Sequence, residues 1–174
     1  VADVMLIWTQ PQAIIPLFAD TLRGNRHDHN AVMKEVDEYC DQIINAKAKA
    51  LNCLVPTWTL DPAYRGFGLL DLDSSIGISR LLFEMNLRLM KRLDDVPNIT
   101  ALNADRWISR SRDESYDPRL WYMAKVPFTS QVFDEAVRDI RAAIRAFSGK
   151  SKKCIVLDLD HTLWGGVVGD LGHE

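Results

Sequence analysis

The spacing of apolar residues along the chain predicts strands and helices in alternation. Short, unbroken apolar runs are typical of buried strands, and they occur at residues 4–8, 53–57 and 99–102. Apolar residues that recur every three or four positions predict amphipathic helices, here over residues 32–50, 78–93 and 133–147, with a short helix expected at 104–112. Alternation of this kind is the signature of a parallel sheet with helices on both faces. We therefore expect an α/β domain with three layers, α/β/α.

The connecting segments are expected to be irregular. Residues 12–30 carry a polar stretch, residues 59–76 form a long loop, and residues 116–129 form an aromatic-rich loop. Ser130 is the expected cap of the last long helix. Because the first residues already form a predicted strand and no Met precedes them, we expect the sheet to be short of strands and the chain to be a fragment.

Composition narrows the class of protein. Among the 174 residues, 47% are hydrophobic and the net charge is −3, so electrostatics favour neither nucleic acid nor an anionic membrane as partner. The chain has no apolar run of membrane-spanning length and no signal peptide, so we expect a cytoplasmic protein. The three cysteines, Cys40, Cys53 and Cys154, lack metal-type spacing and are expected to be buried thiols.

The tail carries the clearest chemistry. The apolar run Cys154–Leu157 leads directly into Asp158, Asp160 and Thr162. In parallel sheets, chemistry collects where strands end. Two carboxylates and a hydroxyl at such an end can hold a divalent cation and present a nucleophile to a phosphate. The alternative is a polar turn in which the carboxylates cap a helix.

The residues of this tail resemble a known motif. Asp158–Thr162, read as Asp-Leu-Asp-His-Thr, is similar to motif I of the haloacid dehalogenase (HAD) superfamily, and Leu163–Asp170 narrows the resemblance to its FkbH-like branch. The resemblance extends upstream through Arg65–Asp71, Met85–Leu89 and Tyr116–Phe128. His161 departs from the Asn or Asp that is frequent at its position in that family.

The resemblance implies a protein of two parts. Residues 1–147 would form an SGNH-hydrolase-like, flavodoxin-like domain, residues 148–153 a linker, and residues 154–174 the first strand of a HAD-like Rossmannoid domain. Further HAD motifs are expected after residue 174, so the chain as given would hold an incomplete site. Whether this piece is itself an enzyme stays open.

The resemblance also implies an activity. FkbH-like proteins load a glyceryl unit from 1,3-bisphosphoglycerate onto an acyl carrier protein with release of phosphate, in polyketide and related pathways. By resemblance, Asp158 is the nucleophile, Asp160 the general acid and base, and both hold Mg²⁺, while Thr162 supports the loop. The expected partners are therefore an acyl carrier protein and a phosphorylated three-carbon substrate.

The SGNH-like part lacks the residues that a hydrolase needs. Asp117 stands at the Asp-x-x-His position, but Leu120 replaces the histidine base, and Thr9-Gln10-Pro11 follows the first strand where the fold normally has an Asn. Without the histidine, a serine nucleophile has no proton acceptor. This favours a non-catalytic module that recruits a carrier protein over an SGNH esterase.

Three further segments each allow two interpretations. Arg65, with Gly66 and Gly68 beside it, could bind a phosphate or phosphopantetheine, or form a structural turn. His27–His29 could bind a metal, although a solvated loop is the simpler interpretation. Trp121–Tyr122 could grip the arm of a carrier protein or fold back onto the core.

Overall fold

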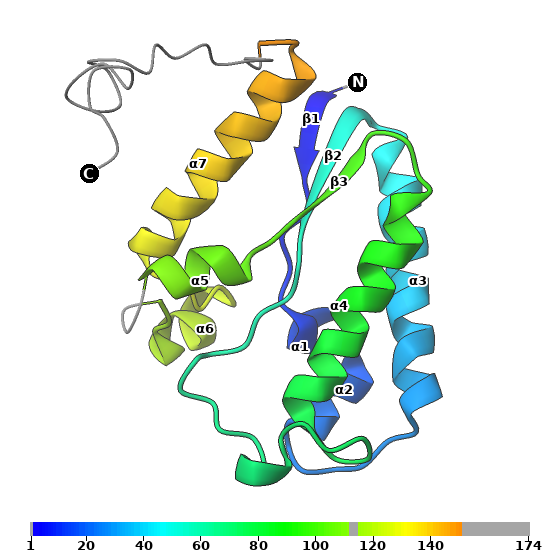
Figure 1. The fold of residues 1–174 in the computed structure, drawn as a ribbon, viewed down its shortest axis with the longest axis vertical. Coiled ribbons are helices and arrows are strands. Elements are labelled where there is room, and N and C mark those ends of the chain that lie inside the picture. The colour runs from blue at the N-terminus through cyan, green and yellow to red at the C-terminus, as the bar shows by residue number, and fades with distance from the viewer. Residues whose placement is uncertain (1, 112–114, 151–174) are drawn as a thin grey trace, which may run out of the picture.

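The structure, a computed structural model, describes residues 2–111 and 115–150. Its three strands are β1 (Ala2–Leu6), β2 (Ala50–Pro56) and β3 (Ile99–Leu102). They form one sheet in the order β1-β2-β3 (Figure 1), and both neighbouring pairs are parallel. The register sets Met5 opposite Cys53, and Cys53 opposite Ile99. The predicted α/β fold with a parallel sheet is confirmed.

Helices cover both faces of this sheet. The helices α3 (His29–Lys47) and α4 (Ile78–Asp94) lie on one face, and α5 (Asp105–Ser111) and α7 (Ser130–Phe147) lie on the other (Figure 1). The connections contain four shorter elements: α1 (Pro11–Ile14), α2 (Pro16–Thr21), the 3-10 turn η1 (Gly68–Leu70) and α6 (Pro118–Ala124).

The larger core lies between the sheet and the pair α3 and α4. The apolar stripe of α4 is buried at each position that the sequence pattern marks: Ile78, Leu82, Met85, Leu89 and Leu93. The stripe packs with α3 against Cys53 and Val55 of β2. The helical period of the sequence therefore identified the buried face of α4 correctly.

A second, aromatic core lies on the opposite face. Trp8, just after β1, packs with its ring centroid 5.0 Å from Trp107, 5.0 Å from Phe128 and 5.3 Å from Phe133. The indole N–H of Trp107 donates to Asp139 Oδ2 at 2.7 Å, which joins α5 to α7. These rings hold α5 and α7 against the carboxyl end of the sheet.

Some expected boundaries are wrong. The first strand spans Ala2–Leu6 rather than residues 4–8, and the cap of α7 is Thr129 rather than Ser130. Residues 12–30 and 116–129 are not wholly irregular, because they contain α2 and α6, respectively. Both helices begin at a proline, whose fixed φ favours the first helical turn.

Other expectations concern residues at the end of the chain. The division into residues 1–147, 148–153 and 154–174 stays a prediction, because residues 151–174 lie outside the described residues. Cys40 and Cys53 are buried and free, as expected. None of the described helices has both the length and the apolar character needed to cross a bilayer.

Candidate functional site

The motif predicted to carry phosphoryl chemistry is not part of the described structure. Asp158, Asp160 and Thr162 lie outside the described residues, as does Cys154. Their roles stay predictions. The sites that the structure does describe lie in the segments that follow the three strands.

Hydrogen-bonded side chains fill the carboxyl edge of the sheet. Thr9 Oγ1 lies 2.8 Å from Tyr39 Oη, and it accepts from the indole N–H of Trp58 at 3.1 Å. Thr59 Oγ1 lies 2.8 Å from Tyr116 Oη. Burial raises the pKa of Tyr39 to about 12 and also raises the pKa of Tyr116. Neither phenol is therefore available as a base at neutral pH.

Asn86 braces this edge from α4. Its Oδ1 accepts from the backbone N–H of Trp58, and its Nδ2 donates to the Trp58 carbonyl, each at 2.8 Å. Trp58 is only 2% exposed, so water does not replace these bonds. The amide of Asn86 fixes where the chain leaves β2.

Asp117 has a structural role at the start of α6. It is the N-cap residue, and its Oδ1 accepts from the Arg119 backbone N–H at 3.0 Å. The Arg119 guanidinium donates to the same carboxylate at 2.9 Å. The side-chain hydrogen bonds from Arg119 lower the pKa of Asp117. Asp117, which the resemblance places at an Asp-x-x-His position, therefore serves as a helix cap.

The glycine turn beside Arg65 is built around a carboxylate of the same loop. Gly66 and Gly68 have φ values of +52° and +62°, which L side chains rarely adopt. A Cβ atom on Gly66 would collide with Asp71, and Asp71 Oδ1 accepts from the Ser79 backbone N–H at 3.1 Å. Arg65 itself is exposed. The close approach that Gly66 permits is made to Asp71.

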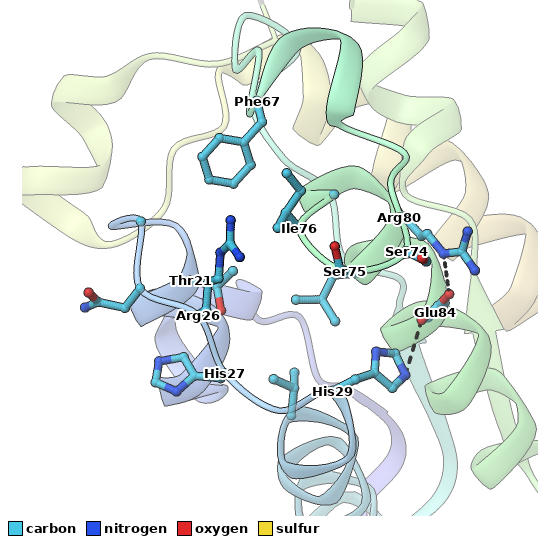
Figure 2. Close-up of a pocket in the computed structure, with 15 residues that line it drawn as sticks. Thr21, Arg26, His27, His29, Phe67, Ser74, Ser75, Ile76, Arg80 and Glu84 are labelled. Atoms are coloured by element: carbon cyan, nitrogen blue, oxygen red, sulfur yellow. Dashed lines mark hydrogen bonds and ion pairs between the residues drawn. The ribbon is translucent and has the colours of Figure 1, made fainter.

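A small polar pocket lies between the α2–α3 segment and the start of α4 (Figure 2). This pocket, called the α2–α4 pocket, has a volume of about 50 Å³. Its polar lining includes Arg26, His27, His29, Ser75, Arg80 and Glu84. The segments that line it belong to the connections that follow β1 and β2.

Glu84 contacts two basic side chains of the α2–α4 pocket, Arg80 and His29. Its two oxygens lie 2.9 Å from Arg80 Nε and 3.2 Å from His29 Nε2. Within the described part of the chain, the Arg26 guanidinium has neither an ion pair nor a hydrogen bond. Figure 2 shows Arg26 extending from the α2–α3 segment towards the loop that carries Phe67 and Ile76.

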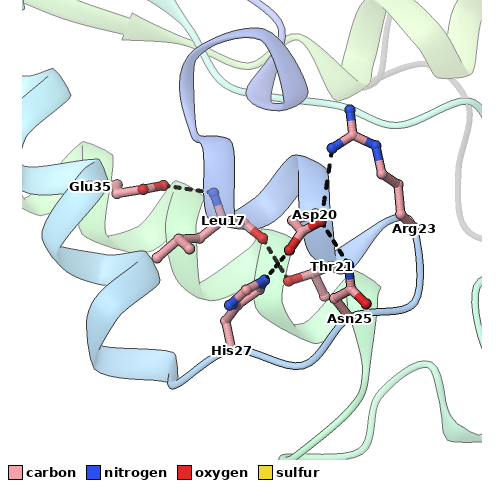
Figure 3. A network of polar contacts seen from close by, with 7 residues as sticks. All are labelled: Leu17, Asp20, Thr21, Arg23, Asn25, His27 and Glu35. Atoms are coloured by element: carbon pink, nitrogen blue, oxygen red, sulfur yellow. Dashed lines mark hydrogen bonds and ion pairs between the residues drawn. The ribbon is translucent and has the colours of Figure 1, made fainter.

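A network around Asp20 holds the α2–α3 segment in place (Figure 3). Asp20 Oδ2 lies 2.6 Å from His27 Nε2, and Asp20 Oδ1 accepts from Asn25 Nδ2 at 2.8 Å. These bonds lower the pKa of Asp20, with the Asn25 bond contributing most. Arg23 lies 3.8 Å from the same carboxylate. His27 and His29 thus have different carboxylate partners, and the described residues contain no group of three or more side chains suited to a metal.

An aromatic pocket of about 220 Å³ lies at the same end of the sheet. Its lining includes Tyr64, Tyr116, Trp121 and Tyr122. Tyr122 is 80% exposed, so it does not fold back onto the core. The ammonium of Lys125 lies 5.4 Å from the centre of the Trp121 ring. The segments that follow β1, β2 and β3 all contribute to this pocket, which brings the Trp121–Tyr122 pair to the carboxyl edge.

Sequence reasoning missed most of the α2–α4 pocket. The polar stretch of residues 23–30 is visible in the sequence. The pairing of His29 with Glu84 joins residues far apart in the chain, and no local pattern indicates it. The same holds for Asn86 and Trp58.

These features define an α/β protein of the three-layer, parallel-sheet class. No family model matches the sequence, and no curated protein is significantly similar to it. The fold is similar to the crystal structure of the N-terminal part of the protein BF1531 from Bacteroides fragilis, described as containing a phosphatase domain and as complexed with Mg. The TM-score is 0.70 at 21% sequence identity, and the match covers 98% of this chain and 44% of that chain. The chain thus spans less than half of its structural neighbour, and the likeness establishes the fold.

Proposed function

We propose that this chain belongs to a magnesium-dependent phosphoryl-transfer protein of the HAD type. The observation that carries the proposal is the sequence Asp158-x-Asp160-x-Thr162 directly after the apolar run Cys154–Leu157. The phosphatase domain and the bound Mg of the structural neighbour support it. Carboxylate and hydroxyl oxygens are the donors that Mg²⁺ prefers, so the residue types of the motif fit this ion.

In this proposal, Asp158 forms a covalent intermediate. A carboxylate oxygen of Asp158 attacks phosphorus while the bond from phosphorus to the leaving oxygen breaks, and Asp160 gives that oxygen a proton. Asp160 then takes a proton from a water that attacks the aspartyl-phosphate, which releases phosphate and frees Asp158. Mg²⁺, held by Asp158 and Asp160, would screen the repulsion between carboxylate and phosphate.

The finer proposal concerns the substrate. The resemblance to FkbH-like proteins favours 1,3-bisphosphoglycerate as donor and an acyl carrier protein as acceptor of the glyceryl unit, in the cytoplasm. The complete protein would release phosphate as the glyceryl unit is loaded. The residues that finish the site would come from beyond residue 174.

The test uses the full-length protein with carrier protein, 1,3-bisphosphoglycerate and Mg²⁺. Asp158→Asn should abolish phosphate release, because an amide cannot attack phosphorus in this way. Asp160→Asn should allow some phosphoenzyme to form and should slow its breakdown, because the carboxyl that protonates the leaving oxygen also activates the attacking water. Near-normal turnover by a folded Asp158→Asn protein would show that the motif is structural.

A second candidate function concerns residues 1–147 alone. This domain would recruit the carrier protein without catalysis, and the exposed Tyr122 at the aromatic pocket favours this role. Tyr122→Ala should weaken binding of the carrier protein, whereas Leu87→Ala, which removes another exposed side chain on α4, should not. Equal affinities for both variants would reject the aromatic pocket as the contact.

An SGNH esterase is the remaining alternative. The capping role of Asp117 argues against it, since its carboxylate is engaged by Arg119. The chain should not hydrolyse p-nitrophenyl acetate above the rate of a protein control. Steady turnover that Asp117→Ala abolishes would restore the esterase interpretation.

A further inference from the structure

We propose that the α2–α4 pocket binds a phosphate group. This site uses none of the residues of the motif at Asp158–Thr162, so it is distinct from the proposed reaction centre. The inference rests on the proposed function only for the two molecules that would bring the phosphate. These are a phosphorylated three-carbon acid and the phosphopantetheine arm of a carrier protein.

The charge of the lining favours an anion. Arg26 and Arg80 contribute two permanent positive charges, and among the described residues Glu84 is the only carboxylate in the lining. Glu84 is already engaged by Arg80 and His29. The lining therefore keeps an excess of positive charge, and Arg26 has no partner among the described residues.

The hydrogen-bonding groups of the lining also suit phosphate. A guanidinium presents several N–H donors in a plane and matches phosphate oxygens with two parallel bonds. Ser74 and Ser75 line the same pocket. The Ser75 hydroxyl donates to Asp73 Oδ1 at 2.7 Å. This bond orients the segment that carries Ser74 and Ser75. Side chains of Arg26 and Ser74 can therefore supply donors without breaking an existing bond.

In this proposal, the backbone N–H groups at the start of α4 do not bind the anion. Asp71 Oδ1 accepts from the Ser79 N–H, and Asp73 Oδ1 accepts from the Ser75 and Ile76 N–H groups. These carboxylates already satisfy the N–H groups before and within the first turn of α4. They repel an anion, but neither carboxylate is among the lining residues. Binding must then depend on the arginine side chains, which is what the test examines.

The position of the arginine segment is fixed before any ligand arrives. Asp20 holds both His27 and Asn25, on either side of Arg26 (Figure 3). The Leu17 N–H donates to Glu35 Oε2 at 2.9 Å, which ties α2 to α3. Because this segment is already ordered, its backbone loses little further conformational entropy when the phosphate binds.

The size of the pocket selects a small group. Its volume of about 50 Å³ is several times the roughly 10–15 Å³ that one water requires. That is enough for a phosphate group and too little for a nucleotide. A larger molecule would place its phosphate inside and leave the remainder in solvent.

The experiment measures binding by calorimetry on the full-length protein carrying Asp158→Asn, in EDTA. Asp158→Asn prevents attack on phosphorus, and EDTA removes the Mg²⁺ that would hold phosphate at the proposed reaction centre, so failure here is separate from failure of the proposed function. The probes are inorganic phosphate, 3-phosphoglycerate and 4′-phosphopantetheine, each compared with glycerate or pantetheine. Tighter binding of one phosphate ester than of the other identifies the source of the phosphate, and equal binding assigns the pocket to the phosphate group alone.

Matched variants decide whether the α2–α4 pocket is responsible. Arg26→Gln should weaken phosphate binding about tenfold, and Arg26→Lys should weaken it less, because the charge remains but the planar donor set is lost. Arg141→Gln makes the same charge change at an exposed position of α7 and should leave binding unchanged. If Arg26→Gln fails to fold, Arg80→Gln tests the pocket from α4.

Three results would overturn the proposal. One is the absence of saturable binding of any phosphate probe. Another is that the Arg26→Gln variant binds the phosphate probes as tightly as the protein with an unmodified pocket does, or that Arg141→Gln weakens binding by the same factor. The third is equally tight binding of glycerate or pantetheine, because then the phosphate group is not what is recognised.

Discussion

Replacing Asn86 with alanine should destabilise the domain by about 2–3 kcal/mol. The Asn86 amide makes two hydrogen bonds of 2.8 Å to the backbone N–H and carbonyl of Trp58. Trp58 follows β2 and is 2% exposed. Removing the amide therefore leaves a donor and an acceptor that water reaches poorly.

The magnitude follows from three contributions. The N–H and the carbonyl of Trp58 each lose their partner, and a buried group left without one costs about 1–3 kcal/mol. Alanine is the better helix former in α4, which returns roughly 0.5 kcal/mol. The site is partly open, because Asn86 is half-buried, so the lower part of the range applies to the unpaired groups.

The assay is urea unfolding followed by circular dichroism, with the midpoint compared at an unchanged m-value. Leu87→Ala is the matched control on the same helix, because Leu87 is 60% exposed, and it should change stability by less than about 0.5 kcal/mol. Asn86→Asp should be more harmful at neutral pH than at acidic pH, where a protonated carboxyl can donate to the Trp58 carbonyl. A loss below about 0.5 kcal/mol for Asn86→Ala would refute the role given to the amide.

Three other predictions concern polar groups and a thiol. Tyr116→Phe should cost about 1–2 kcal/mol, because it removes the 2.8 Å bond to the buried Thr59; a double-mutant cycle with Thr59→Val should show coupling, and additivity would contradict it. The Arg88 hydrogen bonds lower the pKa of Asp37 below 3.8, so its stabilisation is complete above that pH and is lost as the pH falls through the lower folded value. Asp37→Asn should therefore flatten the fall in stability as the pH drops below about 4, measured by urea unfolding, and an unchanged slope would count against it. Burial raises the pKa of Cys40 to about 11, so native protein at about pH 8 should protect this thiol from iodoacetamide until urea is added; rapid native labelling, mapped by mass spectrometry, would show the thiol to be accessible.

Long periodic segments were predictable, because a buried helix face requires apolar residues at the same spacing over many residues. The stripe from Ile78 to Leu93 covers four turns of α4, so chance matches are few. Residues 53–57 were found for a similar reason, since β2 is buried along most of its length. By contrast, α1 has four residues and α6 has seven, too few for a period to appear. Their prolines were the available signal.

The pockets were less predictable, because their contacts join distant parts of the chain. The Glu84 carboxylate on α4 meets His29 at the start of α3, and this depends on how two helices pack. Composition does not encode such a pairing. The segments that follow the strands could be placed together at the carboxyl edge, but which side chains meet there depends on the loops.

The cap that Asp117 provides for α6 has an evolutionary consequence. A carboxylate that stabilises a helix start and pairs with Arg119 contributes to folding whether or not the protein is a hydrolase. This structural role does not depend on a histidine three residues later. In related sequences, its presence is therefore no guide to hydrolase activity, and the residue at position 120 is the informative one.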